Sequence, residues 1–235
     1  MKRRLTMFRR IILPLFSFLF VINGGAWAKS IEEGGGLGPQ STQGIGEKRV
    51  LMVVVRFPDI TPTTPIEMVK RRVVSGFNMY VVEQSYGLAS VNADFRGYVM
   101  LPDPLALYKV SQYNPQVDKR RVRKLIEDTM TAIEKEVNFS SYDHILIIPA
   151  VHTTAGTGYG MPCYCANPGM LTGVTMRQGR RGGKEFDRYE TLRSKGGKEF
   201  SGGVFVGAEN ANLGMFAHDY FHTLGGLYNG ERLVP

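Results

Sequence analysis

Short apolar runs alternate along the chain with longer segments that have an apolar residue every three or four positions, and these patterns predict strands and helices respectively. Two continuous runs rich in isoleucine and valine, Val50–Val55 and His144–Ile148, are typical of strands buried on both faces of a sheet. Val204–Val206 predicts a further short strand. From Val91 to Leu101 apolar and polar residues alternate, which predicts a strand or one arm of a hairpin.

The first segment with helical spacing covers residues 65–84. Thr64 precedes it as a candidate N-cap, Pro65 occupies the first helical position, and Glu67 stands where a capping box places its carboxylate. We therefore expect the side chains of Thr64 and Glu67 to satisfy the free backbone amides at the start of this helix.

Two more helices are predicted, over residues 118–137 and 212–224. The first has one apolar stripe among basic and acidic residues, and the second ends at Gly225-Gly226, a favourable C-terminal stop. The Gly-rich, polar region 149–203 favours a hairpin or a long surface loop. This succession of elements predicts an α/β (α+β) fold, with a mixed sheet covered by helices.

Residues 1–28 have the features of a secretory signal peptide. A basic start precedes the apolar run Ile11–Ile22, and Ala26-Trp27-Ala28 fits the small-x-small cleavage rule. The run has 12 residues, fewer than the ~20 that span a membrane, although an uncleaved anchor is the alternative. We therefore expect a secreted or periplasmic protein that leaves the membrane after cleavage, with a flexible leader at 29–47 and one domain at 48–235.

The composition is that of an ordinary globular protein, with 43% hydrophobic and 21% charged residues among 235, which excludes collagen-like and disordered chains. The net charge of +8 falls to +3 without the five basic residues of the predicted signal peptide, because 24 basic and 21 acidic side chains remain. This balance gives no basic footprint, so we expect no nucleic-acid partner. Cys163 and Cys165 fit no common zinc template, and we expect two thiols or one local bridge.

Candidate metal chemistry lies in the last predicted helix. His218 and His222 are four residues apart, so both imidazoles can share one helix face and bind one ion. Zinc takes such nitrogens and keeps one position open for water in catalytic sites. Asp219 stands where the H-E-x-x-H motif has its general base, so the motif here is H-D-x-x-H. A histidine pair without a metal is the alternative. His144 is expected to be a structural residue with its hydrogen bonds satisfied, and His152 a solvated loop residue.

Six segments occur in a characteristic order: Phe57-Pro58-Asp59, Val82–Gly87, Phe95–Val99, Leu101-Pro102, Val137–Asp143 and His218–Gly225. Together they resemble the immune inhibitor A-like family of secreted zinc metallopeptidases, of the zincin clan, over most of residues 48–235. The resemblance implies a metzincin-like mixed sheet with the active-site helix under it and near the C-terminus. It also implies that His218 and His222 bind zinc and that Asp219 is the general base.

Two features depart from the family pattern. The family has glutamate where Asp219 stands, and the aspartate side chain is one methylene shorter. If the backbone does not compensate, the carboxylate is displaced by about 1 Å or more relative to the zinc-bound water, which can reduce the rate ~10²-fold. The family also follows its Leu-Gly with an acidic segment that helps to complete the metal site, whereas this chain continues through Tyr228 and Glu231 to Pro235. Either the third ligand is in this tail, with Glu231 the best oxygen donor and Tyr228 at metzincin spacing, or the sequence is a fragment and the ligand lies beyond Pro235.

These features predict an exported zinc-dependent metalloendopeptidase that hydrolyses protein or peptide substrates. Zn²⁺ would lower the pKa of a bound water, and Asp219 would accept its proton. An edge strand, with Val204–Val206 as the candidate, is expected to hold an extended substrate by backbone hydrogen bonds. The alternative is a catalytically degraded zincin-like domain that acts as a binding or structural module.

Overall fold

The computed structural model describes side chains for residues 44–108, 118, 120–152 and 191–224. It describes the backbone alone for Lys119, for Gly225 and for short strands at 31–34, 38–41, 163–164, 177–181, 184–187, 227–228 and 231–232.

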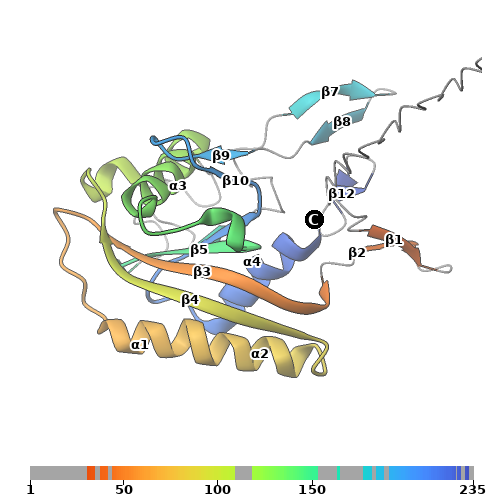
Figure 1. Ribbon diagram of the computed structural model, residues 1–235, viewed down its shortest axis with the longest axis horizontal. Coiled ribbons are helices and arrows are strands. Elements are labelled where there is room, and N and C mark those ends of the chain that lie inside the picture. The colour runs from red at the N-terminus through yellow and green to blue at the C-terminus, as the bar shows by residue number, and fades with distance from the viewer. Residues whose placement is uncertain are drawn as a thin grey trace, which may run out of the picture.

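A five-stranded sheet forms the centre of the molecule, in the order β4-β3-β5-β11-β6 (Figure 1). Its strands are β4 (Ala89–Met100), β3 (Gly46–Arg56), β5 (His144–Pro149), β11 (Gly203–Gly207) and β6 (Cys163–Tyr164). The first four are parallel to one another, and β6 pairs with β11 in the antiparallel direction. This mixed sheet with its helices confirms the predicted α/β class. The alternative that β4 is a hairpin arm is wrong, because β4 runs parallel to β3.

The remaining described strands form four antiparallel pairs. They are β1 (Ile31–Gly34) with β2 (Gly38–Ser41), β7 (Arg177–Arg181) with β8 (Lys184–Asp187), β9 (Leu192–Arg193) with β10 (Glu199–Phe200), and β12 (Leu227–Tyr228) with β13 (Glu231–Arg232). Two of these pairs lie within the Gly-rich region where a hairpin was expected. The β1–β2 pair lies within the predicted leader, and the domain boundaries themselves stay predictions.

One long helical segment connects β3 to β4. It comprises α1 (Ile66–Lys70), a π-helical turn η2 (Arg71–Gly76) and α2 (Phe77–Gln84). The predicted capping box is wrong, because the helix is capped by Pro65 without a side-chain hydrogen bond. The Thr64 hydroxyl instead contacts Nε2 of His152 at 3.0 Å, 88 residues away.

The other two long helices follow their predictions closely. Helix α3 (Lys119–Ile133) is capped by Asp118, which accepts hydrogen bonds from the amides of Arg120 and Arg121, and it ends four residues earlier than expected. Helix α4 (Leu213–Gly225) begins after Asn212, whose side-chain oxygen accepts a hydrogen bond from the Met215 amide at 3.0 Å. Two 3₁₀ turns, η3 (Leu105–Tyr108) and η4 (Phe139–Ser141), complete the described helices.

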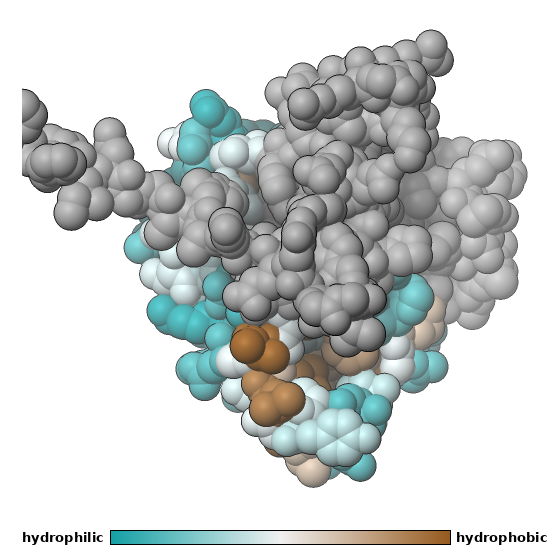
Figure 2. Space-filling model, turned by 90° about the vertical axis from the view of Figure 1, so that its right-hand side faces the viewer, coloured by the Kyte–Doolittle hydropathy of each residue, from teal (hydrophilic) through white to brown (hydrophobic). Residues whose placement is uncertain are grey.

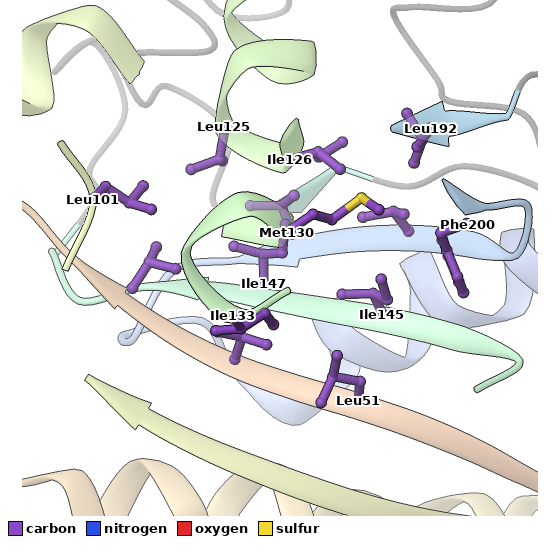
Figure 3. Packing of buried hydrophobic residues seen from close by; sticks show 14 of the residues in the cluster. Leu51, Leu101, Leu125, Ile126, Met130, Ile133, Ile145, Ile147, Leu192 and Phe200 are labelled. Atoms are coloured by element: carbon purple, nitrogen blue, oxygen red, sulfur yellow. The ribbon is translucent and has the colours of Figure 1, made fainter. Parts of the chain in front are cut away.

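The helices cover both faces of the sheet and so create two apolar cores. On one face, α3 packs its residues Leu125, Met130 and Ile133 over β5, as Figure 3 shows. On the other face, the α1–α2 segment and α4 pack against the opposite side chains of the same strands. Residues 50–55 of β3 are fully buried, because alternate side chains enter alternate cores.

Apolar side chains are exposed where β3 and β4 begin. Ile45 and Leu88 are 60% and 66% exposed, and the Gly46 amide donates a hydrogen bond to the Leu88 carbonyl. Figure 2, which views this end of the molecule, shows hydrophobic atoms gathered there among polar ones. No helix in the described part of the chain is both long and apolar enough to cross a membrane.

Close contact between β11 and α4 depends on Gly207. A β-carbon at this position would lie 2.1 Å from Cε1 of the buried Phe216 ring. We expect Gly207→Ala to lower the free energy of unfolding by about 1–3 kcal/mol, because the buried ring would have to shift within a packed core. Urea denaturation followed by circular dichroism measures this change. Gly44→Ala is the control, since nothing lies within 4 Å of its added methyl group. Equal stability of the two variants would contradict the packing argument.

His144 begins β5 and is 1% exposed. Its ring packs edge-on against Tyr220 of α4, with centroids 5.6 Å apart. The expectation of a satisfied histidine is wrong within the described structure, because neither ring nitrogen has a hydrogen-bond partner among the described residues. Burial lowers the pKa of His144 from 6.5 to about 4, and this exceeds the opposing effect of Asp143.

This shift predicts a pH-dependent stability. The unfolded chain binds a proton at His144 below about pH 6.5, and the folded chain does so only below about pH 4. Keeping His144 neutral therefore costs no folding free energy above pH 6.5. As the pH falls toward 4, the free energy of unfolding decreases by up to about 3 kcal/mol, because the unfolded chain binds the proton and the folded chain does not. Urea denaturation between pH 4 and 8 should show a steeper loss for the natural protein than for His144→Phe, which keeps the ring contact without a titrating group. Parallel pH profiles for the two proteins would contradict this assignment.

Candidate functional site

Helix α4 lies under the sheet and presents two different faces. The buried face, which packs on the sheet and on α2, consists of Phe216, Ala217, Tyr220, Thr223 and Leu224. His218 and Phe221 are exposed on the opposite side, and His222 is partly exposed. Packing of the apolar face therefore determines which way the two histidines point.

The two motif histidines lie side by side, as the i, i+4 spacing predicts. Nε2 of His218 and Nε2 of His222 are 3.1 Å apart, and the ring centroids are 4.7 Å apart with an interplanar angle of 81°. With both rings neutral this contact is a hydrogen bond. The same spacing suits one tetrahedral ion, because two nitrogens bound at ~2.0–2.1 Å lie ~3.3 Å apart. The distance between the two Nε2 atoms is therefore compatible with two ligands of one zinc ion.

The electrostatic environment of the pair also suits a cation. His222 lies in the last turn of α4, where the unpaired carbonyls of a helix carry partial negative charge. The described residues include no Lys or Arg on α4.

Asp219 is 6% exposed, in contrast to the exposed His218 beside it. Successive residues of an α-helix are about 100° apart, so Asp219 lies at the flank of the histidine face. The carboxylate is thus placed between the water-exposed histidines and the core. Its role as a general base stays a prediction.

The two candidates for the third ligand, Glu231 and Tyr228, lie in the short strands that follow α4. They belong to β13 and β12 respectively, but their side chains lie outside the described residues. Among the described residues, no three His, Cys, Asp or Glu side chains lie close enough together to hold a metal ion. Cys163 is in β6, where it pairs with Gly207, and Cys165 lies outside the described residues.

The expectation that Val204–Val206 is an edge strand is wrong. These residues form the centre of β11, which has β5 on one side and β6 on the other. β5 pairs along one side of β11, and β6 pairs with Val206 and Gly207 on the other, so a peptide strand cannot be added at these two residues. β6 is an outer strand of this sheet in the described structure, and it packs against α4.

A second polar cluster escaped the sequence analysis. Thr63, Thr64, His152 and Glu209 meet at the edge of the sheet where β3, β5 and β11 end. We call these four residues the carboxyl-edge cluster. Their signal in the sequence was position. Each polar residue follows a predicted strand by three to nine positions, and the carboxyl ends of parallel strands meet at one edge of a sheet.

Comparison with known proteins adds no relative. The sequence matches no family model and no curated protein. Functional inference therefore depends on the residues described above and on the resemblance in the motifs.

Proposed function

We propose that this protein is an exported zinc-dependent metalloendopeptidase. The observation that carries the proposal is the 3.1 Å separation of the two Nε2 atoms on one exposed face of α4. The position of α4 under a mostly parallel sheet supports it, because the resemblance implies an active-site helix in that place. Export is supported by the signal-like pattern of residues 1–28.

Zinc, when bound, would supply a polarised carbonyl and a water of lowered pKa. His218 and His222 would hold the ion through their Nε2 atoms, so each ring must be neutral with its proton on Nδ1. Asp219 would accept a proton at its carboxylate and later return it to the leaving amine. The buried face of α4 would keep these three groups in a constant relative orientation, which catalysis requires.

A protein or peptide in an extended conformation is the substrate class that this arrangement suits. No other described strand pairs with the outer side of β6, and β6 packs against the helix that carries the histidines. Backbone hydrogen bonds to such a strand would align the scissile bond without reading its side chains. We therefore assign substrate alignment to β6 in place of β11.

The second candidate function is a zincin-like binding or structural module without catalysis. It is favoured by Asp219 in place of glutamate and by the lack of a third close ligand among the described residues. The two functions differ in metal content and in turnover, and the following experiments separate them.

Zinc content is the first test. After gel filtration the natural protein should retain about one zinc per chain more than His218→Ala retains, because that variant leaves a single imidazole on α4. Mass spectrometry of the metal content gives the stoichiometry. Phe221→Ala is the matched control, since it truncates an exposed residue of the same helix. Full zinc retention in His218→Ala would contradict the proposed ligands.

The Asp219 carboxylate is the second test. Asp219→Asn keeps the shape but removes the base, so we expect zinc retention with a ~10²–10⁴-fold lower kcat for a fluorogenic peptide. Asp219→Glu should retain zinc and raise activity, since the added methylene brings the carboxylate toward the metal-bound water. Unchanged activity in Asp219→Asn would exclude it as the base. A large loss in Asp219→Glu with zinc retained would instead indicate a site built around aspartate. No turnover in any variant, with zinc bound, would favour the binding module.

A further inference from the structure

Four side-chain atoms form a continuous chain of contacts in the carboxyl-edge cluster. The Thr63 hydroxyl donates to Oε1 of Glu209 at 3.1 Å, and the same Oε1 is 3.4 Å from Nε2 of His152. That nitrogen is in turn 3.0 Å from the Thr64 hydroxyl. Since Thr63 and Thr64 are consecutive residues, the two ends of this chain of contacts belong to neighbouring positions of the sequence.

The contact between His152 and Glu209 is long for a hydrogen bond between an imidazolium and a carboxylate. Charge-assisted N–H···O bonds measure about 2.7–2.9 Å, whereas this distance is 3.4 Å. Two ligands of one ion at ~2.1 Å lie ~3.0–3.4 Å apart for angles between octahedral and tetrahedral. The spacing therefore fits two ligands of a shared cation better than a direct ion pair.

A catalytic triad does not explain the cluster. In a triad the histidine contacts the nucleophile through one ring nitrogen and the acid through the other. Here Nε2 of His152 faces both the Thr64 hydroxyl and the Glu209 carboxylate. One nitrogen cannot accept a proton from Thr64 while it donates one to Glu209.

One oxygen of the buried Glu209 carboxylate lacks a hydrogen-bond partner among the described residues. The side chain is fully buried, and the oxygen without such a partner is Oε2. Asp128, which is also buried, differs: its carboxylate contacts the hydroxyl of Tyr108 and the ammonium groups of Lys124 and Lys195. A buried carboxylate without such partners is strongly destabilising unless a cation compensates it.

The topology places the cluster where α/β sheets bind ligands. The connection from β3 leads to β4 on one side, and the connection from β4 passes back over β3 to β5 on the other. The strand order therefore reverses between β3 and β5. Thr63 and Thr64 follow β3, and His152 follows β5, so the cluster lies at the carboxyl ends flanking this reversal, on the left in Figure 1.

Arg72 is a cationic residue that hydrogen-bonds to the backbone at the buried acid. Its Nη1 donates to the carbonyl oxygens of Glu209 and Ala211, at 2.6 and 3.2 Å. The guanidinium is thus held on the backbone, and no contact joins it to the Glu209 carboxylate among the described residues. Its charge partly offsets that of Glu209 and should weaken, without abolishing, the binding of a further cation.

We propose that the carboxyl-edge cluster binds a divalent transition-metal ion through Nε2 of His152 and the carboxylate of Glu209. The hydroxyls of Thr63 and Thr64 are further oxygen donors, and water completes the coordination. The ligand set selects zinc- or manganese-like ions, because calcium and magnesium take oxygen ligands and rarely imidazole. His152 is 55% exposed, so the ion can reach the cluster from solvent. This site is separate from the histidine pair of α4 and does not depend on the proposed peptidase activity.

The test uses the full chain with His218→Ala and His222→Ala, which removes the histidine pair. This double variant, freed of metal and mixed with zinc sulfate, should retain about one zinc per chain. Zinc at ~100 times its Kd should raise its Tm by about 5–10 °C. Adding His152→Ala should abolish both effects, and this substitution disturbs no core packing because the side chain is exposed. Glu199→Gln, at an exposed carboxylate, is the control and should leave both effects unchanged.

Two further measurements identify the ligands. Glu209→Gln keeps the shape of the side chain and removes its charge, so it should abolish the zinc-induced Tm shift while the metal-free protein stays folded. Copper(II) bound to the double variant should show coupling to one imidazole nitrogen in its electron paramagnetic resonance spectrum. No zinc retention in the double variant, or retention that survives His152→Ala, would overturn the proposal. If Glu209→Gln fails to fold, His152→Ala decides alone.

Discussion

Residues 50–55 of β3 are fully buried. Helix α3 covers one face of the strand, and the α1–α2 segment and α4 cover the other. A strand buried in this way can satisfy its backbone only through neighbouring strands, and here β4 and β5 supply them on either side. Both pairings are parallel, so each chain connection must cross the sheet and each strand must end at the same edge. The helices, the strand order and the meeting of three carboxyl ends all depend on this burial.

Packing of α4 on β11 positions the histidine pair relative to the sheet. Gly203 and Gly207 leave no room for a β-carbon next to Thr223 and Phe216 respectively. The helix therefore lies close to the strand at both glycines. Its rotation about its own axis is determined by contacts that tolerate no extra methyl group. Because the apolar face is held, the exposed face that carries His218 and His222 is held as well. A metal site built on such a face needs no separate device to orient its ligands.

Much of the fold could be predicted because the signals were local. Continuous apolar runs identified β3 and β5, and the periodicity of residues 118–137 identified α3 with its buried stripe. The spacing of His218 and His222 likewise predicted that their rings would meet. The edge position assigned to Val204–Val206 failed, because three apolar residues look alike at the edge and inside a sheet, and the two-residue strand β6 gives little sequence signal. The carboxyl-edge cluster was missed for a related reason: Thr63 and Glu209 are 146 residues apart, and only the topology joins them.

The failed capping box and the missed cluster have one cause. A threonine N-cap contributes about 1 kcal/mol to a helix, and Thr64 stands at the right distance from Glu67 to form one. In the structure the helix begins at Ile66 with Pro65 as its N-cap and without that bond, and the Thr64 hydroxyl contacts His152 instead. A local preference is thus unmet beside a buried carboxylate, Glu209, whose Oε2 lacks a partner among the described residues. Two departures from local stability at one place in the chain are more typical of a binding site than of a loop that only connects strands.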